Sequence, residues 1–183
     1  MRINIFLIFS LTLQQISFGQ DSTKFRLLTF GLPNFEREDA KKIIAKKWSI
    51  DFYAVEDCIV DQDLIDSTER ENKIQNEKIT AFYGQDWRNK FEKEVDDEFI
   101  VHQKISKLID KQKFIKNKRA ELKKLDEPLF YKVKSTNLKN VYEVIVDSYG
   151  KWQGKDEFII YYILEVDYNR KFVKILSDKP KLE

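Results

Sequence analysis

The segment from residue 87 to residue 99 is the most strongly patterned part of this chain. Its large apolar residues are spaced four apart, which places all of them on one face of an α-helix. Further apolar residues continue this face toward residue 125, and we expect a break at 101–106 because one helix to 125 would be unusually long. A helix with so broad an apolar face has to be covered by a sheet or by other helices. The stripe consists of Trp87, Phe91, Val95 and Phe99.

The segments on either side of this helix predict an α+β fold. Before it, the pattern indicates a strand-helix-strand unit followed by a helical segment. After Pro128 it indicates an antiparallel β-meander, which we expect at least one helix to cover. The expected elements are a strand at 24–30, helix at 35–47, strand at 50–60, helical segment at 63–83, and strands at 130–134, 141–147, 158–166 and 172–176.

Residues 1–19 have the pattern of a cleaved secretory signal peptide. Arg2 supplies a positive start, residues 5–13 are apolar, and small residues precede the polar Gln20. This apolar stretch is too short to span a bilayer, as is the one at 158–164. We therefore expect an exported protein, periplasmic or secreted, with no transmembrane segment after signal cleavage. The chain then divides into the signal peptide at 1–19, a mixed α/β and helical region at 20–126, and an antiparallel β region at 127–183 packed into the same domain.

Charge and cysteine content argue against several functions. The 33 Lys and Arg residues nearly cancel the 31 Asp and Glu residues, so the chain lacks the positive field that recruits nucleic acid. Cys58 is the only cysteine, so no disulfide can form within the chain. One Cys and one His cannot make a Cys/His zinc site. We predict no cofactor.

Few titratable residues suggest chemistry. Cys58 follows two acidic residues, which disfavour a thiolate, and lies on the apolar side of its predicted strand, so we expect an inert buried thiol. An intermolecular disulfide is the alternative. His102 lacks an identifiable catalytic partner and is expected to lie exposed on its helix. Asp61, Asp63 and Asp66 are weak candidates for Ca²⁺, but their spacing is not that of an EF-hand, and an acidic helix N-terminus is the favoured interpretation.

Two segments have the composition of a binding surface. Residues 104–124 contain nine basic residues against two acidic ones and can face an anionic lipid, a polysaccharide or an acidic partner, although an ordinary solvated helix face is the alternative. Residues 148–157 predict a loop with amphipathic aromatic side chains, which stack on sugars or anchor partner proteins. The candidate binding residues of the two segments are Lys111, Lys116, Arg119, Tyr149 and Trp152.

Several short stretches between residues 30 and 98 resemble a set of small exported bacterial proteins, the FEKKY domain family. The stretches are 45–50, 58–60, 64–67, 83–87 and 91–95. In the last of them, Glu94 and Val95 stand where the family name has Lys and Tyr. The family has no established activity, so the resemblance implies a domain and an exported location but no catalytic residue.

The sequence contains no complete catalytic motif, whereas it does contain basic and aromatic surface candidates. It therefore predicts a noncatalytic protein that binds a macromolecule, either a protein or a glycan, in the cell envelope or outside the cell. Two alternatives stay open. One is a hydrolase that cleaves glycans with a pair of carboxylates. The other is a small-molecule carrier or sensor, which would have a closed apolar pocket between its sheet and its helices.

Overall fold

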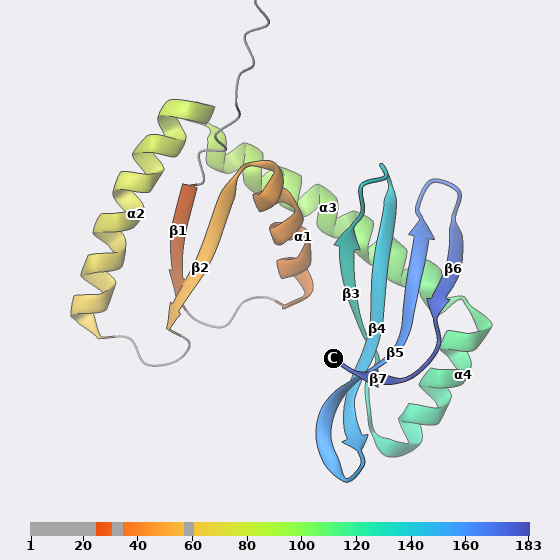
Figure 1. Cartoon of the computed structure of the whole chain (residues 1–183). Coiled ribbons are helices and arrows are strands. Elements are labelled where there is room, and N and C mark those ends of the chain that lie inside the picture. The colour runs from red at the N-terminus through yellow and green to blue at the C-terminus, as the bar shows by residue number, and fades with distance from the viewer. Residues whose placement is uncertain (1–24, 31–34, 57–60) are drawn as a thin grey trace, which may run out of the picture.

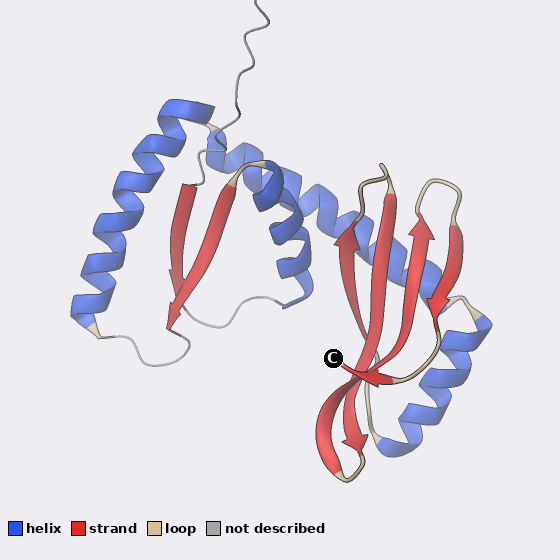
Figure 2. Ribbon diagram, in the orientation of Figure 1, coloured by secondary structure: helices blue, strands red, loops and turns tan. Residues whose placement is uncertain are grey.

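A computed structural model describes residues 25–30, 35–56 and 61–183 and has the α+β fold that the sequence predicts. Two parallel strands with flanking helices form its first part, and an antiparallel sheet backed by helices forms its second (Figures 1 and 2). The helices are α1 (Phe35–Lys47), α2 (Gln62–Tyr83), α3 (Trp87–Asp110), α4 (Lys113–Leu122) and the short 3₁₀ helix η1 (Lys123–Leu125). The strands are β1 (Phe25–Phe30), β2 (Ile50–Glu56), β3 (Phe130–Ser135), β4 (Val141–Trp152), β5 (Lys155–Asp167), β6 (Phe172–Ser177) and β7 (Lys181–Leu182).

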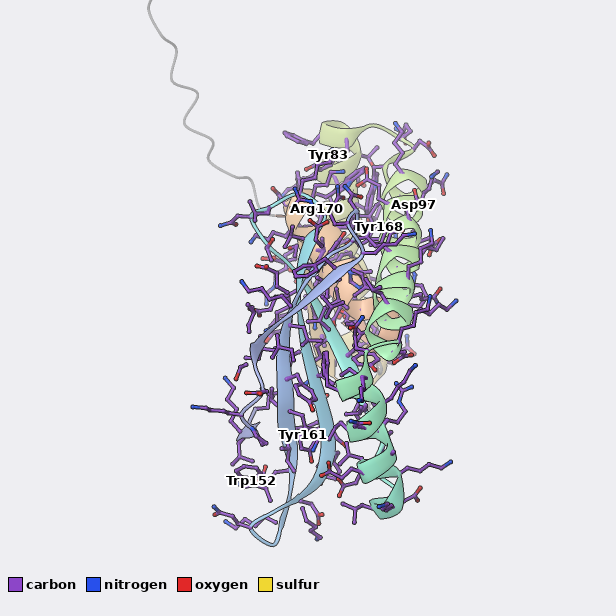
Figure 3. The ribbon with its side chains drawn as sticks, turned by 90° about the vertical axis from the view of Figure 1, so that its right-hand side faces the viewer. Tyr83, Asp97, Trp152, Tyr161, Tyr168 and Arg170 are labelled. Carbon is purple, nitrogen blue, oxygen red and sulfur yellow. The ribbon has the colours of Figure 1, made fainter. Side chains whose placement is uncertain are left out.

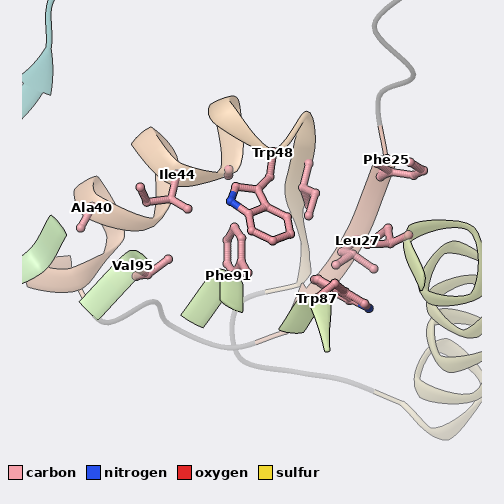
Figure 4. Packing of buried hydrophobic residues seen from close by; sticks show 11 residues of the cluster. Phe25, Leu27, Ala40, Ile44, Trp48, Trp87, Phe91 and Val95 are labelled. Carbon is pink, nitrogen blue, oxygen red and sulfur yellow. The ribbon is translucent and has the colours of Figure 1, made fainter. Parts of the chain in front are cut away.

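The first core forms where α1 and α3 pack against the parallel pair β1 and β2. Phe91 of α3 is fully buried, and its ring meets the indole of Trp48 edge-on, with centroids 5.9 Å apart. Figure 4 shows Phe91 and Val95 pointing from α3 toward α1 and Trp48. Phe91 and Val95 of the predicted stripe are therefore buried on one face of the helix, as their spacing predicts. The buried members of this core are Phe25, Leu27, Ala40, Ile44, Ala45, Trp48, Ile50, Ile79, Trp87, Phe91 and Val95.

Ion pairs fix α1 along α3. The guanidinium of Arg37 donates to Glu92 and Asp96, each at 2.8 Å. At the C-terminal end of α1, Glu94 of α3 accepts from Lys47 Nζ at 2.8 Å and from the indole N–H of Trp48 at 3.0 Å. Because these pairs lie on the rim of the apolar contact, they hold α1 in one position along α3.

The second core lies between the antiparallel sheet and the helices that follow residue 100. The sheet has the order β3-β4-β5-β6, and β7 pairs with β5 beyond the end of β6, so the predicted meander of the last three long strands is confirmed. α3 and α4 cover one face of the sheet (Figure 1). The buried residues of this core are Ile105, Ile109, Ile115, Val133, Tyr142, Val144, Val146, Leu164 and Val166.

One helix, α3, contributes to both cores. Its 24 residues extend for about 36 Å. The break expected at 101–106 is wrong, because the buried side chains of Ile105 and Ile109 continue the same apolar face under the second sheet. The chain turns only at Lys111 and Gln112, just before α4. The boundary between the two cores therefore lies within α3. Residues 126 and 127, where the sequence analysis divides the chain into regions, lie in the link from η1 to β3.

Helix side chains satisfy the outer edges of two strands. The amide of Asn72 in α2 bonds both backbone groups of Leu28 in β1, accepting from its N–H at 2.8 Å and donating to its carbonyl at 2.9 Å. Asp39 of α1 accepts from the N–H of Val133 in β3 at 3.2 Å. An edge that is paired in this way no longer offers its backbone to another strand at that position.

We expect Phe91→Ala to lower the free energy of unfolding by about 3–5 kcal/mol, because it leaves a cavity where α1, β2 and α3 meet. Urea denaturation followed by tryptophan fluorescence measures the change. Phe172→Ala is the matched control, since Phe172 is 57% exposed and its loss should cost less than about 1 kcal/mol. Equal losses for the two variants would contradict this account of the first core.

Candidate functional site

The segment predicted as a loop at 148–157 is instead a β-hairpin. Strands β4 and β5 pair from Val141 and Asp167 out to Trp152 and Lys155, and the chain reverses at Gln153 and Gly154. Both turn residues have positive φ, 50° and 86°, which is typical of the tight turns that match the twist of a hairpin. Glycines in this segment predicted a long loop, but the reversal needs only two residues. The strands continue on both sides of it.

Residues 148–158 of this hairpin, which we call the arm, project beyond the rest of the sheet. β3 begins opposite Asp147, and β7 ends opposite Ile159, so the arm has no neighbouring strand on either side. At its base, the N–H of Glu183 donates to the carbonyl of Phe158 at 3.1 Å. The rings of Tyr149 and Phe158 lie in contact, with centroids 5.1 Å apart and their planes tilted by 57°, and the two residues are 49% and 43% exposed. Trp152, which is partly buried, lies near the free end of the arm (Figure 3).

The base of the arm lies beside α4, the centre of the basic segment. Lys118 Nζ lies 4.6 Å from the centroid of Tyr161, where the strand leaves the arm. Lys111 and Lys116 are exposed and have no ion-pair partner among the described residues. The structure thus brings the aromatic arm and the basic helix, which are far apart in sequence, to the same end of the sheet (Figure 1).

Arg119, the third basic candidate, is occupied within the fold. Its guanidinium donates to Asp110 at 2.6 Å and to the hydroxyl of Tyr131 at 2.8 Å. The Tyr131 hydroxyl in turn donates to Asp110. Burial, reinforced by the Asp110 charge, raises the pKa of Tyr131, so this hydroxyl stays protonated. Arg119 therefore joins α4 to the end of α3 and to β3.

A buried carboxyl that the sequence analysis did not single out lies where the arm joins the sheet. Asp147 has no exposed surface, and its Oδ2 lies 2.8 Å from Nζ of Lys132 on β3. The same ammonium bonds the Glu183 carboxylate at 2.6 Å. Burial is the main cause that raises the pKa of Asp147, and Lys132 opposes the rise. The signal available in the sequence was a single acid directly after the apolar run Val144-Ile145-Val146.

This buried acid does not resemble the carboxylate pair of a glycan hydrolase. A general acid or nucleophile has to reach the substrate, and the side chain of Asp147 is entirely covered. A β-bulge opposite it leaves Tyr161 unpaired and lets both Asp147 and Ser148 lie inside. The arrangement is that of a structural ion pair that links β3, β4 and the segment after β7.

The prediction that His102 is exposed is wrong. His102 is 4% exposed, because α3 continues unbroken beneath the sheet and carries this residue inward with it. Its Nε2 lies 3.3 Å from Glu98 Oε1, and its ring meets Tyr142 edge-on at 6.0 Å. The imidazole beside Glu98 lowers the pKa of that carboxyl, and burial raises the pKa of Tyr142. Glu98 and His102 lie on α3 between Val95 of the first core and Ile105 of the second, and Tyr142 belongs to the second core.

The acidic candidates lie at the start of α2. Asp61 caps the helix by accepting from the N–H of Leu64 at 2.8 Å, and Asp66 accepts from the side chain of Gln62. In residues 25–30, 35–56 and 61–183, no three His, Cys, Asp or Glu side chains gather closely enough to hold a metal ion. Cys58 lies outside the described residues, so its burial stays a prediction.

An open hollow lies along α2 and is lined mainly by polar side chains. It differs from the closed apolar pocket that a carrier would have, because it is broad at the surface and lies away from the antiparallel sheet. No helix in the described part of the chain is both long and apolar enough to cross a membrane. The hollow is lined by Glu69, Asn72, Lys73, Asn76, Glu77, Thr80, Ala81 and Gln85.

Comparison with protein-family models, curated proteins and solved structures gives no match. Membership of the FEKKY domain family therefore stays a prediction. Several residues that carry the resemblance build the first core, since Trp48, Trp87 and Phe91 are buried in it. Glu94, which departs from the family pattern, bonds the end of α1 instead.

Lys132→Met should lower the free energy of unfolding at pH 7 by about 2 kcal/mol, because it leaves the Asp147 charge buried without a partner. Lys132 itself is partly exposed, so solvent screening reduces the loss. The pKa of Asp147 is already raised by burial and should rise further in the variant. The folded state then holds a proton that the unfolded state releases, so the loss should shrink as the pH falls from 7 toward the ordinary carboxyl range. Urea denaturation across this pH range tests both statements.

Lys134→Met is the control, since Lys134 is exposed two residues further along the same strand. Adding Asp147→Asn to Lys132→Met should abolish the extra pH dependence. A pH-independent loss in the single variant would show that Lys132 contributes packing alone.

Proposed function

We propose that this chain is an exported, noncatalytic protein that binds another protein of the cell envelope or extracellular space, with the arm as its main contact surface. The observation that carries the proposal is the arm itself, a two-stranded ribbon without neighbouring strands that exposes two aromatic rings in contact. Aromatic side chains that keep exposed surface in the free protein are the residues that most often dominate binding energy at protein interfaces.

The chemistry around the arm favours a protein that carries negative charge. Lys116, which has no ion-pair partner among the described residues, lies on α4, and this helix lies at the same end of the sheet as the arm. Such a charge increases association rates with an acidic surface. The arm also has an internal ion pair, Lys151 with Asp156 at 2.7 Å, which holds its two strands together across the turn. A paired, two-stranded ribbon loses less conformational freedom on binding than a loop of the same length.

The test places a photo-reactive amino acid at Lys155, which is exposed on the arm, in the tagged protein within its own producing cells. We expect a discrete cross-linked partner protein. Trp152→Ala should weaken binding to the partner by about 2 kcal/mol, or about 30-fold in affinity, and reduce the yield of the cross-linked product accordingly. A partly buried indole is the kind of anchor residue whose alanine substitution costs this much binding energy.

The matched control carries the same photo-reactive group at Lys139, which is exposed in the turn between β3 and β4. That turn lies at the opposite end of the sheet (Figure 1). Equal cross-linking from both positions, or a product that survives both Trp152→Ala and Tyr149→Ala in stably folded protein, would overturn the proposal. Cross-linking to glycan alone would favour the carbohydrate alternative.

A further inference from the structure

Strand β6 leaves its outer edge open. The outer edges of β1 and β3 each have a helix side chain bonded to the backbone, through Asn72 and Asp39. For β6, in contrast, no side chain of the described residues bonds to the backbone, and β6 is the last strand in its sheet. Figure 1 shows it at the right-hand edge with no strand beyond it. An open edge of this kind is a template for an added strand.

The side chains of this edge are unusually apolar for a surface. Three large apolar residues lie exposed within the six residues of β6: Phe172 at 57%, Ile175 at 41% and Leu176 at 48%. Leu182 of β7, which pairs with β5 beyond the end of β6, is exposed to a similar degree. Six residues of strand extend for about 20 Å, enough to align a short peptide. The edge therefore offers both backbone groups and apolar contacts to one extended segment.

Charge decides what can occupy this edge. Between residues 171 and 181 the chain has four lysines against one aspartate. β6 itself contains one lysine, Lys174, so two copies paired antiparallel about this residue would place like charges opposite each other, which is destabilising. Nζ of Lys174 lies 4.0 Å from Oε1 of Glu165, and 57% of the Lys174 side chain stays exposed. An acidic segment would pair with these charges, whereas a second copy of this chain would be repelled.

We infer that the edge of β6 binds an extended segment of a different protein, with alternating apolar and acidic side chains, as an additional strand of the sheet. Backbone hydrogen bonds to β6 supply affinity that depends little on sequence. Ile175, which lies on the same face as Val173, selects apolar residues of one parity in the segment, and Lys174 on the other face selects acidic residues. This surface is separate from the arm, so the inference does not rest on the function proposed above.

The probe is an eight-residue peptide of alternating valine and glutamate, compared with one of alternating valine and lysine. The glutamate peptide should bind more tightly by at least about tenfold. It should also slow hydrogen exchange at those β6 amides that do not pair with β5, as strand addition requires. Lys174→Glu with Lys179→Glu should reverse the preference between the two peptides; both residues are exposed, so the fold should persist.

Three outcomes would overturn the inference. One is equal or absent binding of the two peptides, and another is protection of amides outside β6. The third is a dimer in sedimentation whose β6 amides are protected without peptide, because a second copy would then be the occupant. Trp152→Ala should leave peptide binding unchanged, so failure of this inference and failure of the arm proposal give different results.

Discussion

The continuous apolar face of α3 is the constraint on which the arrangement of the molecule depends. Its first half is covered by α1 and the parallel strand pair, and its second half by the antiparallel sheet. The two parts share no strand, so a rigid helix under both is what keeps their relative position fixed. The contact of Asp39 with Val133 adds a second link across the same gap. A kink in α3 would separate the cores without unfolding either of them.

Few polar side chains of the described residues are buried, and the charged ones occupy two places. Glu98 and His102 lie where the two cores meet, and Asp147 lies at the β-bulge. Burial of such groups costs free energy, and an ion pair repays only part of it. Their effect is to exclude alternatives. A one-residue shift of β4 would move Asp147 to the opposite face of the sheet, away from Lys132, and leave its carboxyl without this partner.

Much of the fold could be predicted because its elements have local signals. The spacing from Trp87 to Val95 and the composition after Pro128 correspond to α3 and the meander. What failed depended on contacts that sequence does not contain. His102 looked like a surface residue because only the sheet above it makes that turn of the helix internal. Glycines in the arm predict a loop, but they indicate a turn without showing how short it is, and the strands pair up to a two-residue turn. Tyr149 and Trp152 can nevertheless be chosen as candidates, since aromatic side chains in such a segment are visible in the sequence alone.

The division of the cores along α3 also sets the order in which the chain can fold. Every residue of the first core, with the partly buried side chains packed against it, lies between positions 25 and 99. This core can therefore close while the remainder of the polypeptide is still being delivered, as domains do during synthesis. The second core has to wait until residues 164 and 166 arrive, because they complete its centre. Until then, the half of α3 beyond residue 100 exposes its apolar side chains. That interval is the period in which these side chains are accessible to a chaperone.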